Sequence, residues 1–129
     1  MNIQAAAARA GLSVKTVRYY DDIELVRAGR ANNGYREYGE AEIHKLIFLG
    51  RARSLGFSID DCRQLLSLYE DDSRASSDVK ALASRQLEEI DRKLAELGAL
   101  RKTLSELMHK CHGDDRPDCP ILEGLAGKV

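Results

Sequence analysis

Two cysteines near the end of the chain, Cys111 and Cys119, have the residue type and the spacing to hold one soft metal ion. They flank a seven-residue loop that begins with His112 and Gly113 and is followed by Pro120. Thiolates select soft ions such as Cu(I). Two thiolates suit a two-coordinate monovalent ion, whereas zinc prefers four ligands. The pattern therefore favours a site for one Cu(I), or Ag(I), per protomer.

Other roles for these two thiols stay open at the level of the sequence. A zinc site would have to recruit His109, His112 or an aspartate of the loop. A thiol-redox switch would instead join the cysteines in a disulfide, and two unpaired surface thiols are the plainest alternative. The third cysteine, Cys62, stands beside two leucines on a predicted helix, so we expect it to be a small buried residue.

A second set of residues could contact nucleic acid. The segment Val14–Asp22 is a predicted helix on which Lys15 and Arg18, three positions apart, share one face. Arginine pairs with guanine edges or phosphate, lysine mostly neutralises phosphate, and the hydroxyls of Thr16 and Tyr19 can add contacts. The alternative is an ordinary amphipathic helix with solvated charges.

The segment after this helix adds basic groups beside it. An Asn-Gly pair at 33–34 favours a type I′ turn, so we expect a small hairpin with strands near Val26 and Tyr35. Arg30, Tyr35 and Arg36 would then provide a second set of phosphate donors. Such a hairpin next to a helix-turn-helix is a wing.

Short helices should position these side chains. The alanine-rich segment Ile3–Ala10 predicts a helix, Gly11 suits the position after its end, and Ser13 suits the N-cap of the next helix. Helix, glycine-containing turn and helix together form the helix-turn-helix signature. The spacing of apolar residues predicts two more helices, at 40–54 and from Ser58 to about residue 70.

A much longer helix is predicted from about Val79 to His109, where the sequence contains no proline. Its apolar residues recur at spacings of four and three, which argues for a coiled coil and hence a homodimer. One long helix of an intramolecular bundle is the alternative. The apolar positions are Val79, Ala83, Leu87, Ile90, Leu94, Leu97, Leu104 and Met108. In the tail beyond, Pro120 to Leu125 could form a short helix with proline in its first turn.

These elements predict an all-α fold with a small β wing. We expect a winged helix-turn-helix DNA-binding domain at 1–70, a dimerisation helix at 71–110, and a metal-binding loop with a C-terminal tail at 111–129. Residues 1–54 carry nine Lys and Arg against six Asp and Glu, whereas residues 55–129 carry eleven against fifteen. A basic half joined to an acidic half indicates separate tasks.

The sequence also argues against several other classes of protein. It has no apolar stretch of bilayer length and no secretory signal at its N-terminus, so we expect a cytoplasmic protein with no membrane partner. It offers neither a nucleophile paired with a base nor a phosphate-binding loop. We therefore do not expect an enzyme.

The N-terminal half contains a motif made of Gly11-Leu12-Ser13, Thr16, Arg18-Tyr19-Tyr20, Asn33-Gly34-Tyr35-Arg36 and Tyr38. With this motif the chain resembles the MerR family of bacterial metal-responsive transcription regulators. The resemblance covers essentially the whole chain, and its long helix and Cys-x7-Cys-Pro loop are similar to the branch of copper-efflux regulators.

This resemblance implies a homodimer with an antiparallel coiled coil that binds promoter DNA with or without metal. It further implies an activator: metal would make the dimer bend and undertwist an overlong promoter spacer, so that RNA polymerase can engage both promoter elements. By position, the metal ligands would be Cys111 and Cys119. The implied DNA contacts are Lys15, Arg18, Arg30, Tyr35, Arg36 and Arg53.

One departure within the family bears on the metal. Mercury and zinc members carry a cysteine near the start of the dimer helix, whereas the matching stretch here is Ser76-Ser77-Asp78. No third thiolate is offered, which favours an ion of charge +1. His112 and Pro117 stand at positions that vary among copper and gold branches, so the choice between Cu(I) and Au(I) stays open.

Overall fold

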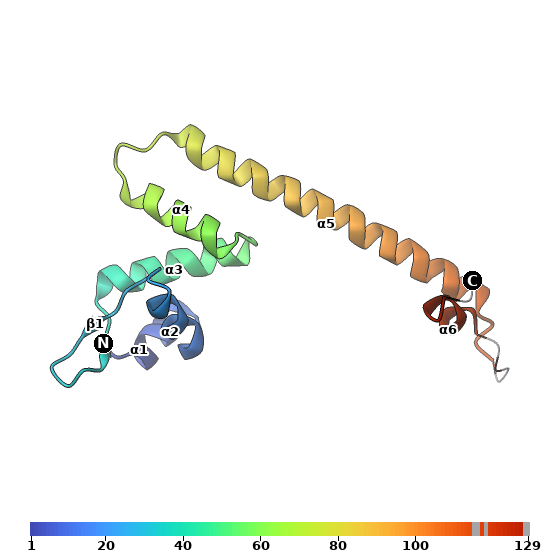
Figure 1. The fold of residues 1–129 in the computed structure, drawn as a ribbon, viewed down its shortest axis with the longest axis horizontal. Helices are drawn as coiled ribbons and strands as arrows, with labels where there is room; N and C mark the ends of the chain where they lie inside the picture. Colours follow the sequence, from blue (N-terminus) through green and yellow to red (C-terminus); the bar gives the residue numbers. More distant parts are fainter. Residues whose placement is uncertain (115–116, 118, 128–129) are drawn as a thin grey trace. The chain divides into compact units, whose positions relative to one another are not determined.

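The computed structural model describes residues 1–114, 117 and 119–127, and it is mostly helical with one two-stranded sheet (Figure 1). The predicted all-α fold with a small β wing is confirmed. In chain order the elements are α1 (Ile3–Ala10), α2 (Val14–Asp22), β1 (Gly29–Arg30), β2 (Arg36–Glu37), α3 (Glu40–Ser54), α4 (Ile59–Glu70), α5 (Ser76–Lys110) and α6 (Pro120–Leu125). Within the described part of the chain, none of these helices is both long and apolar enough to span a bilayer.

The chain divides into two compact units, Met1–Gln86 and Leu87–Val129. The boundary falls inside α5, so the first turns of that helix belong to the N-terminal unit. These units are defined by contacts and do not test the functional ranges predicted from the sequence. The ranges 1–70, 71–110 and 111–129 therefore stay a prediction.

Local signals fix the ends of the first two helices. The Asn2 side chain accepts a hydrogen bond of 2.8 Å from the Ala5 N–H at the start of α1. Gly11, with a φ of 70°, ends that helix in the left-handed conformation that glycine adopts at little cost. Ser13 then caps α2 by accepting from the Thr16 N–H at 3.0 Å. The predicted helix-turn-helix is confirmed with both sets of bounds.

The hairpin forms, but its turn and strands differ from the expectation. Gly29 pairs with Glu37 and Arg30 with Arg36. Among the described residues Glu24 is the one non-glycine with positive φ, so Asn33 does not adopt the conformation that a type I′ turn requires. Instead, Gly34 has a φ of 83° and donates its N–H to the Ala31 carbonyl at 2.9 Å. The loop is therefore a three-residue type with a left-handed glycine, and the type I′ prediction was wrong.

The first strand also begins later than expected. Val26 is buried, and its N–H donates to the Tyr20 carbonyl at 3.1 Å. It therefore closes the C-terminal end of α2 and fills the core, and β1 starts only at Gly29.

The core of the N-terminal unit is built around α3, which packs against both α1 and α4. Fully buried side chains from several elements meet there without any buried charged residue among those described. The core residues are Ala6, Ala7, Val17, Tyr20, Leu25, Val26, Tyr38, Ile43, Leu46, Leu49, Ala52, Phe57, Cys62 and Leu66. Cys62 is thus a core residue, as predicted, and its burial raises the pKa of the thiol.

The first turns of α5 attach to this unit by three contacts. Leu82 is buried, the Gln86 amide donates to the Leu55 carbonyl at 3.0 Å, and Arg85 lies 3.6 Å from Asp61. Gly56 permits the second contact, because a Cβ there would lie 2.6 Å from the Gln86 Nε2. The start of the long helix is therefore fixed to the turn between α3 and α4.

Beyond Gln86, α5 exposes its apolar side chains. Leu94 and Leu97 are each about 60% exposed, and the other large apolar residues of the stripe are between 38% and 67% exposed. The large exposed residues are Leu87, Ile90, Leu94, Leu97, Leu100, Leu104 and Met108. Burying such an exposed apolar stripe would be favourable.

Candidate nucleic-acid interface and thiol site

Helix α2 presents one buried and one exposed face. Val17 and Tyr20 are buried in the core, whereas Lys15 and Arg18 are exposed and Tyr19 keeps 49% of its surface exposed. The core contacts therefore determine which way the basic side chains point. This orientation matches the predicted recognition helix.

Thr16 is less available than its neighbours on the helix. It is partly buried, and its hydroxyl lies 2.8 Å from the Ser13 hydroxyl at the cap of α2. The same serine oxygen accepts the Thr16 N–H. Thr16 therefore fixes the start of the helix, and a nucleic-acid contact from it would have to share this hydroxyl.

The wing places an aromatic side chain at its tip and two arginines at its base. Tyr35 is 74% exposed, next to the left-handed glycine of the turn. Arg30 and Arg36 are cross-strand neighbours in the hairpin register. Like charges in that arrangement repel, so something must offset them.

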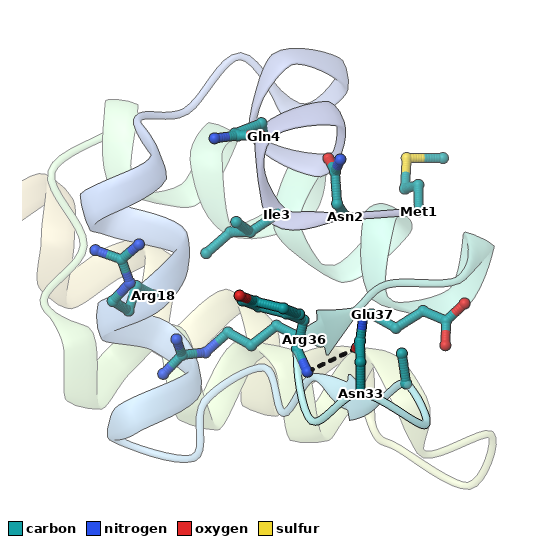
Figure 2. A pocket seen from close by; sticks show the side chains of 10 residues that line it. Met1, Asn2, Ile3, Gln4, Arg18, Asn33, Arg36 and Glu37 are labelled. Atoms are coloured by element: carbon teal, nitrogen blue, oxygen red, sulfur yellow. Dashed lines mark hydrogen bonds between the residues drawn. The ribbon is translucent and has the colours of Figure 1, made fainter.

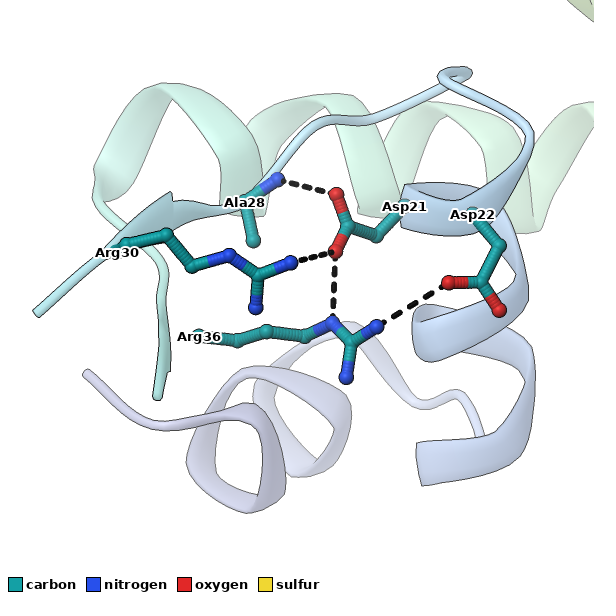
Figure 3. Close-up of polar contacts among 5 residues, drawn as sticks. All are labelled: Asp21, Asp22, Ala28, Arg30 and Arg36. Atoms are coloured by element: carbon teal, nitrogen blue, oxygen red, sulfur yellow. Dashed lines mark hydrogen bonds and ion pairs between the residues drawn. The ribbon is translucent and has the colours of Figure 1, made fainter. Parts of the chain in front are cut away.

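Asp21, at the end of α2, supplies the offsetting charge (Figure 3). Its carboxylate accepts from the Arg36 Nε at 2.7 Å and from the Arg30 Nη2 at 3.4 Å. It also accepts the Ala28 N–H at 3.0 Å, while Asp22 binds the Arg36 Nη2 at 3.1 Å. Burial is the largest influence on Asp21 and raises its pKa, but the Ala28 N–H and the two arginines outweigh it and leave the pKa lowered.

Sequence reasoning missed this aspartate. A signal was present, because two acidic residues at the C-terminal end of a helix oppose the helix dipole and need another reason to be there. The contacts of Asp21 and Asp22 with the two wing arginines provide that reason.

A pocket of about 660 Å³ lies between the start of α1, helix α2 and the wing (Figure 2). Arg18 and Arg36 reach it from two different elements, and Asn2, Gln4 and Asn33 add polar groups. The structure therefore brings Arg18 of α2 together with Tyr35 and Arg36 of the wing at one concave surface, which Glu37 also lines. Of the other predicted contacts, Lys15, Thr16, Tyr19 and Arg30 do not line it.

Arg53 is separate from this pocket. It lies in the last turn of α3, and its Nη1 donates to the Phe57 carbonyl. Its charge also lowers the pKa of Tyr20, although burial is the larger influence and raises it. Arg53 thus has a structural role in closing the turn between α3 and α4, and its predicted DNA contact stays a prediction.

Cys111 and Cys119 occupy matching positions at the two ends of one loop. Cys111 directly follows α5, where its N–H donates to the Met108 carbonyl at 3.1 Å. Cys119 is the N-cap residue of α6, and its carbonyl accepts the Glu123 N–H at 3.0 Å. Both are free, partly buried thiols. Each sulfur is thus attached to a helix end.

Helix α6 returns toward the end of α5. A Cβ at Gly124 would lie only 2.9 Å from a Leu107 methyl, so the two helices approach closely at this point. His109 and His112 are exposed. Among residues 1–114, 117 and 119–127, no cluster of three or more His, Cys, Asp or Glu side chains could hold a metal ion. Thiols such as those of Cys111 and Cys119 are ligands that soft ions prefer.

The chain matches two models of known protein families, which together cover residues 1–107. The family model for the MerR helix-turn-helix regulatory protein matches residues 1–68, and the MerR DNA-binding model matches residues 43–107.

Relatives that match over nearly the full length of the chain are named as transcription regulators. The chain is 60% identical to the transcriptional regulator HmrR of Rhizobium leguminosarum bv. viciae, covering 98% of each chain. It is 49% identical to heavy metal-dependent transcription regulator 2 of Rhizobium meliloti, covering 98% of this chain and 86% of that one. It is 41% identical to the regulator CueR of Yersinia pestis, covering 98% and 92%.

A solved structure shares the fold over nearly the full length. It is the transcription regulator PbrR691 from Ralstonia metallidurans CH34 in complex with lead(II), with a TM-score of 0.80 and 30% identity. The similarity covers 97% of this chain and 98% of that one.

Proposed function

Because this chain belongs to the MerR family of helix-turn-helix transcription regulators, we propose that it is a metal-responsive activator that senses Cu(I). Members of this family are DNA-binding proteins rather than enzymes, and they act on promoter DNA with RNA polymerase. The proposal adds the metal, the ligands and the switch.

The DNA contacts would come from the cationic surface around the pocket. Lys15, Arg18 and Tyr19 are exposed on α2, and Tyr35 is exposed at the wing tip. Arginine in such a position can reach base edges or phosphate, and lysine neutralises phosphate. Arg30 and Arg36 would contribute as phosphate contacts from the base of the wing. Thr16 and Arg53 also belong to the proposed set of DNA contacts. Each also makes a bond within the protein, Thr16 to Ser13 and Arg53 to the Phe57 carbonyl.

A homodimer through α5 would cover the exposed stripe. The stripe keeps its spacing of three and four residues from Leu87 to Met108, the pattern of a coiled-coil seam. Such a dimer would present two DNA-binding units, one for each half of a symmetric site.

The observation that carries the metal proposal is the pair of free, partly buried thiols at the two ends of the α5–α6 loop. Cys111 and Cys119 would hold one Cu(I) per protomer. Two thiolates satisfy a monovalent soft ion and leave a local charge of −1, whereas a divalent ion would need further donors. Ag(I) and Au(I) have the same preference and would bind similarly. The relatives that carry heavy-metal and CueR names support a metal response.

The thiol pair could act on the DNA-binding units only by favouring one form of the dimer. A bound ion shifts such an equilibrium by its differential affinity for the two forms. We propose that the form favoured by Cu(I) distorts the promoter for RNA polymerase, which uses the deformability of DNA rather than new base contacts.

The decisive experiment replaces one ligand at a time. Cys111→Ser and Cys119→Ser should each abolish Cu(I)-dependent transcription in a purified system with RNA polymerase, while affinity for a promoter fragment stays near that of the parent. Cys62→Ala is the matched control, because it removes a thiol from the core of the other unit and leaves both ligands intact. Full copper response in Cys119→Ser would refute the proposal.

X-ray absorption on protein loaded with Cu(I) under reducing conditions tests the ligand number. Two sulfur neighbours are expected, and three or four N, O or S ligands would refute the two-coordinate site. Competition between Cu(I) and Zn(II) tests the alternative of a zinc regulator that recruits His109 or His112. A transcriptional response to oxidant alone, without metal, would favour the thiol-redox alternative.

A further inference from the structure

Asp21 joins three parts of the DNA-binding unit. Its side chain is only 10% exposed, and it binds the backbone of Ala28, the guanidinium of Arg30 and the guanidinium of Arg36. One carboxylate thus connects the end of α2, the segment before the wing and both strands of the wing (Figure 3).

The hairpin is too short to hold the direction of the wing by itself. Each strand is two residues long, and a two-stranded hairpin of any length is marginal without further packing. Tyr38 buries its ring in the core just after β2, which anchors one end of the hairpin. The other end depends on the α2–β1 connection, where Asp21 accepts the Ala28 N–H.

Arg36 is oriented by the same bonds. Its Nε is 2.7 Å from Asp21 and its Nη2 is 3.1 Å from Asp22, so two nitrogens of the guanidinium are held by carboxylates. The Arg36 side chain is 23% exposed and lines the pocket that Arg18 also lines (Figure 2). A guanidinium fixed in this way loses little conformational freedom when it meets a phosphate.

We propose that Asp21 is a positioning residue for DNA binding: it fixes the wing against the recognition helix and presents Arg36 to a phosphate. The proposal rests on the DNA interface proposed above and adds a residue that itself makes no DNA contact.

The proposal can be separated from a simple charge effect by the sign of the change in affinity. A negative charge near DNA should repel the phosphates, so removing it should strengthen binding if charge alone mattered. Positioning predicts the opposite sign.

The test uses the full chain and a duplex selected by the parent protein from a random-sequence library. Fluorescence anisotropy at several salt concentrations gives the dissociation constant and its salt slope. Asp21→Asn should bind at least roughly tenfold more weakly, as expected when a charge-assisted hydrogen bond is lost. Its salt slope should fall by at most about one phosphate contact, the one that Arg36 makes, because Asp21 positions no other.

Two further variants separate position from charge and from simple misfolding. Asp22→Asn removes the same charge from a neighbour that is 59% exposed and has one bond to Arg36, so its affinity should hold or rise. Asp21→Glu keeps the charge but displaces the carboxylate, so it should also bind more weakly. A pure charge effect would instead leave Asp21→Glu at parental affinity and make Asp21→Asn bind more tightly, and either result overturns the proposal.

A double-mutant cycle with Arg36 supplies a readout that general destabilisation would not produce. Arg36→Ala should reduce the salt slope by about one phosphate contact. In that background Asp21→Asn should have less effect on affinity than in the parent, whereas additive losses would contradict the positioning role. If Arg36→Ala leaves both affinity and slope unchanged, the proposed phosphate contact itself fails. If Arg36→Ala weakens binding but Asp21→Asn does not, only the positioning role fails.

Discussion

The two units of this chain differ in how much of their apolar surface is buried. Met1–Gln86 fills its core with its own side chains, so that Leu46 and Leu49 have no exposed surface. Leu87–Val129 contains most of α5 and the short helix α6, and leucines such as Leu94 and Leu97 remain more than half exposed. The first unit therefore buries its large apolar side chains within itself, whereas the second leaves a stripe of them exposed.

The largest expected effect is in the core of the N-terminal unit. Leu46→Ala should cost about 2–5 kcal/mol of unfolding free energy, since it opens a cavity in a fully packed region. Leu100→Ala, at a site 67% exposed, should change the stability of that unit by less than about 0.5 kcal/mol.

Tyrosine fluorescence during urea unfolding measures this difference. The chain has no tryptophan, and all five tyrosines precede residue 70, so the signal reports the N-terminal unit alone. Equal destabilisation by both variants would mean that the two units unfold together, and the contrast between them would not hold.

Association through α5 comes next in size. Leu94→Lys would place a charge in the proposed seam and should weaken the dimer by on the order of 3 kcal/mol. Ala99→Lys adds the same charge on the opposite face of the helix and should leave association intact. Sedimentation equilibrium distinguishes them. A parent protein that is monomeric at micromolar concentration would remove the reason for the exposed stripe.

The proposed DNA interface lies in the N-terminal unit. Arg18→Ala should weaken binding to a selected duplex by about 1–3 kcal/mol if the guanidinium makes a bidentate base contact. The metal affinity of the thiol pair should be unaffected, because Arg18 lies in the other unit. Binding equal to that of the parent would argue against α2 as the recognition helix.

The smallest expected effect concerns Gly98, within the exposed part of α5. A Cβ there would meet nothing within 4 Å, and glycine in a helix interior costs about 1 kcal/mol relative to alanine. Gly98→Ala should therefore raise the helicity and thermal stability of the long helix slightly, as measured by circular dichroism. Weaker association of this variant would indicate that a second helix passes close to the glycine, which would sharpen the description of the seam.

Local chemistry explains why most helix bounds could be predicted. Ser13, Gly11 and Pro120 act on their immediate neighbours, so the ends of α1, α2 and α6 follow from the sequence alone. The long helix begins slightly earlier than expected, at Ser76 rather than near Val79. Helix ends of this kind depend weakly on any single residue.

Features that depend on contacts between distant residues were harder to anticipate. The burial of Leu82, the bond from Gln86 to the Leu55 carbonyl and the convergence of Arg30 and Arg36 on Asp21 all join separate elements. A one-dimensional pattern of apolar spacing carries no information about them. Conversely, the two thiols were apparent from residue type alone, since their chemistry is independent of the fold.

The close approach of Gly124 to Leu107 has a consequence for how tightly the thiols could hold an ion. When α6 rests on α5, the ends of the intervening loop are already restrained, so a ligand that binds Cys111 meets Cys119 at a raised effective concentration. Part of the entropy of closing the chelate ring is then lost during folding rather than during binding. A bulky residue at 124 would separate the helices and return that entropy to the binding step. Selectivity would remain with the sulfurs, but the strength of chelation would be set by a glycine that touches no metal.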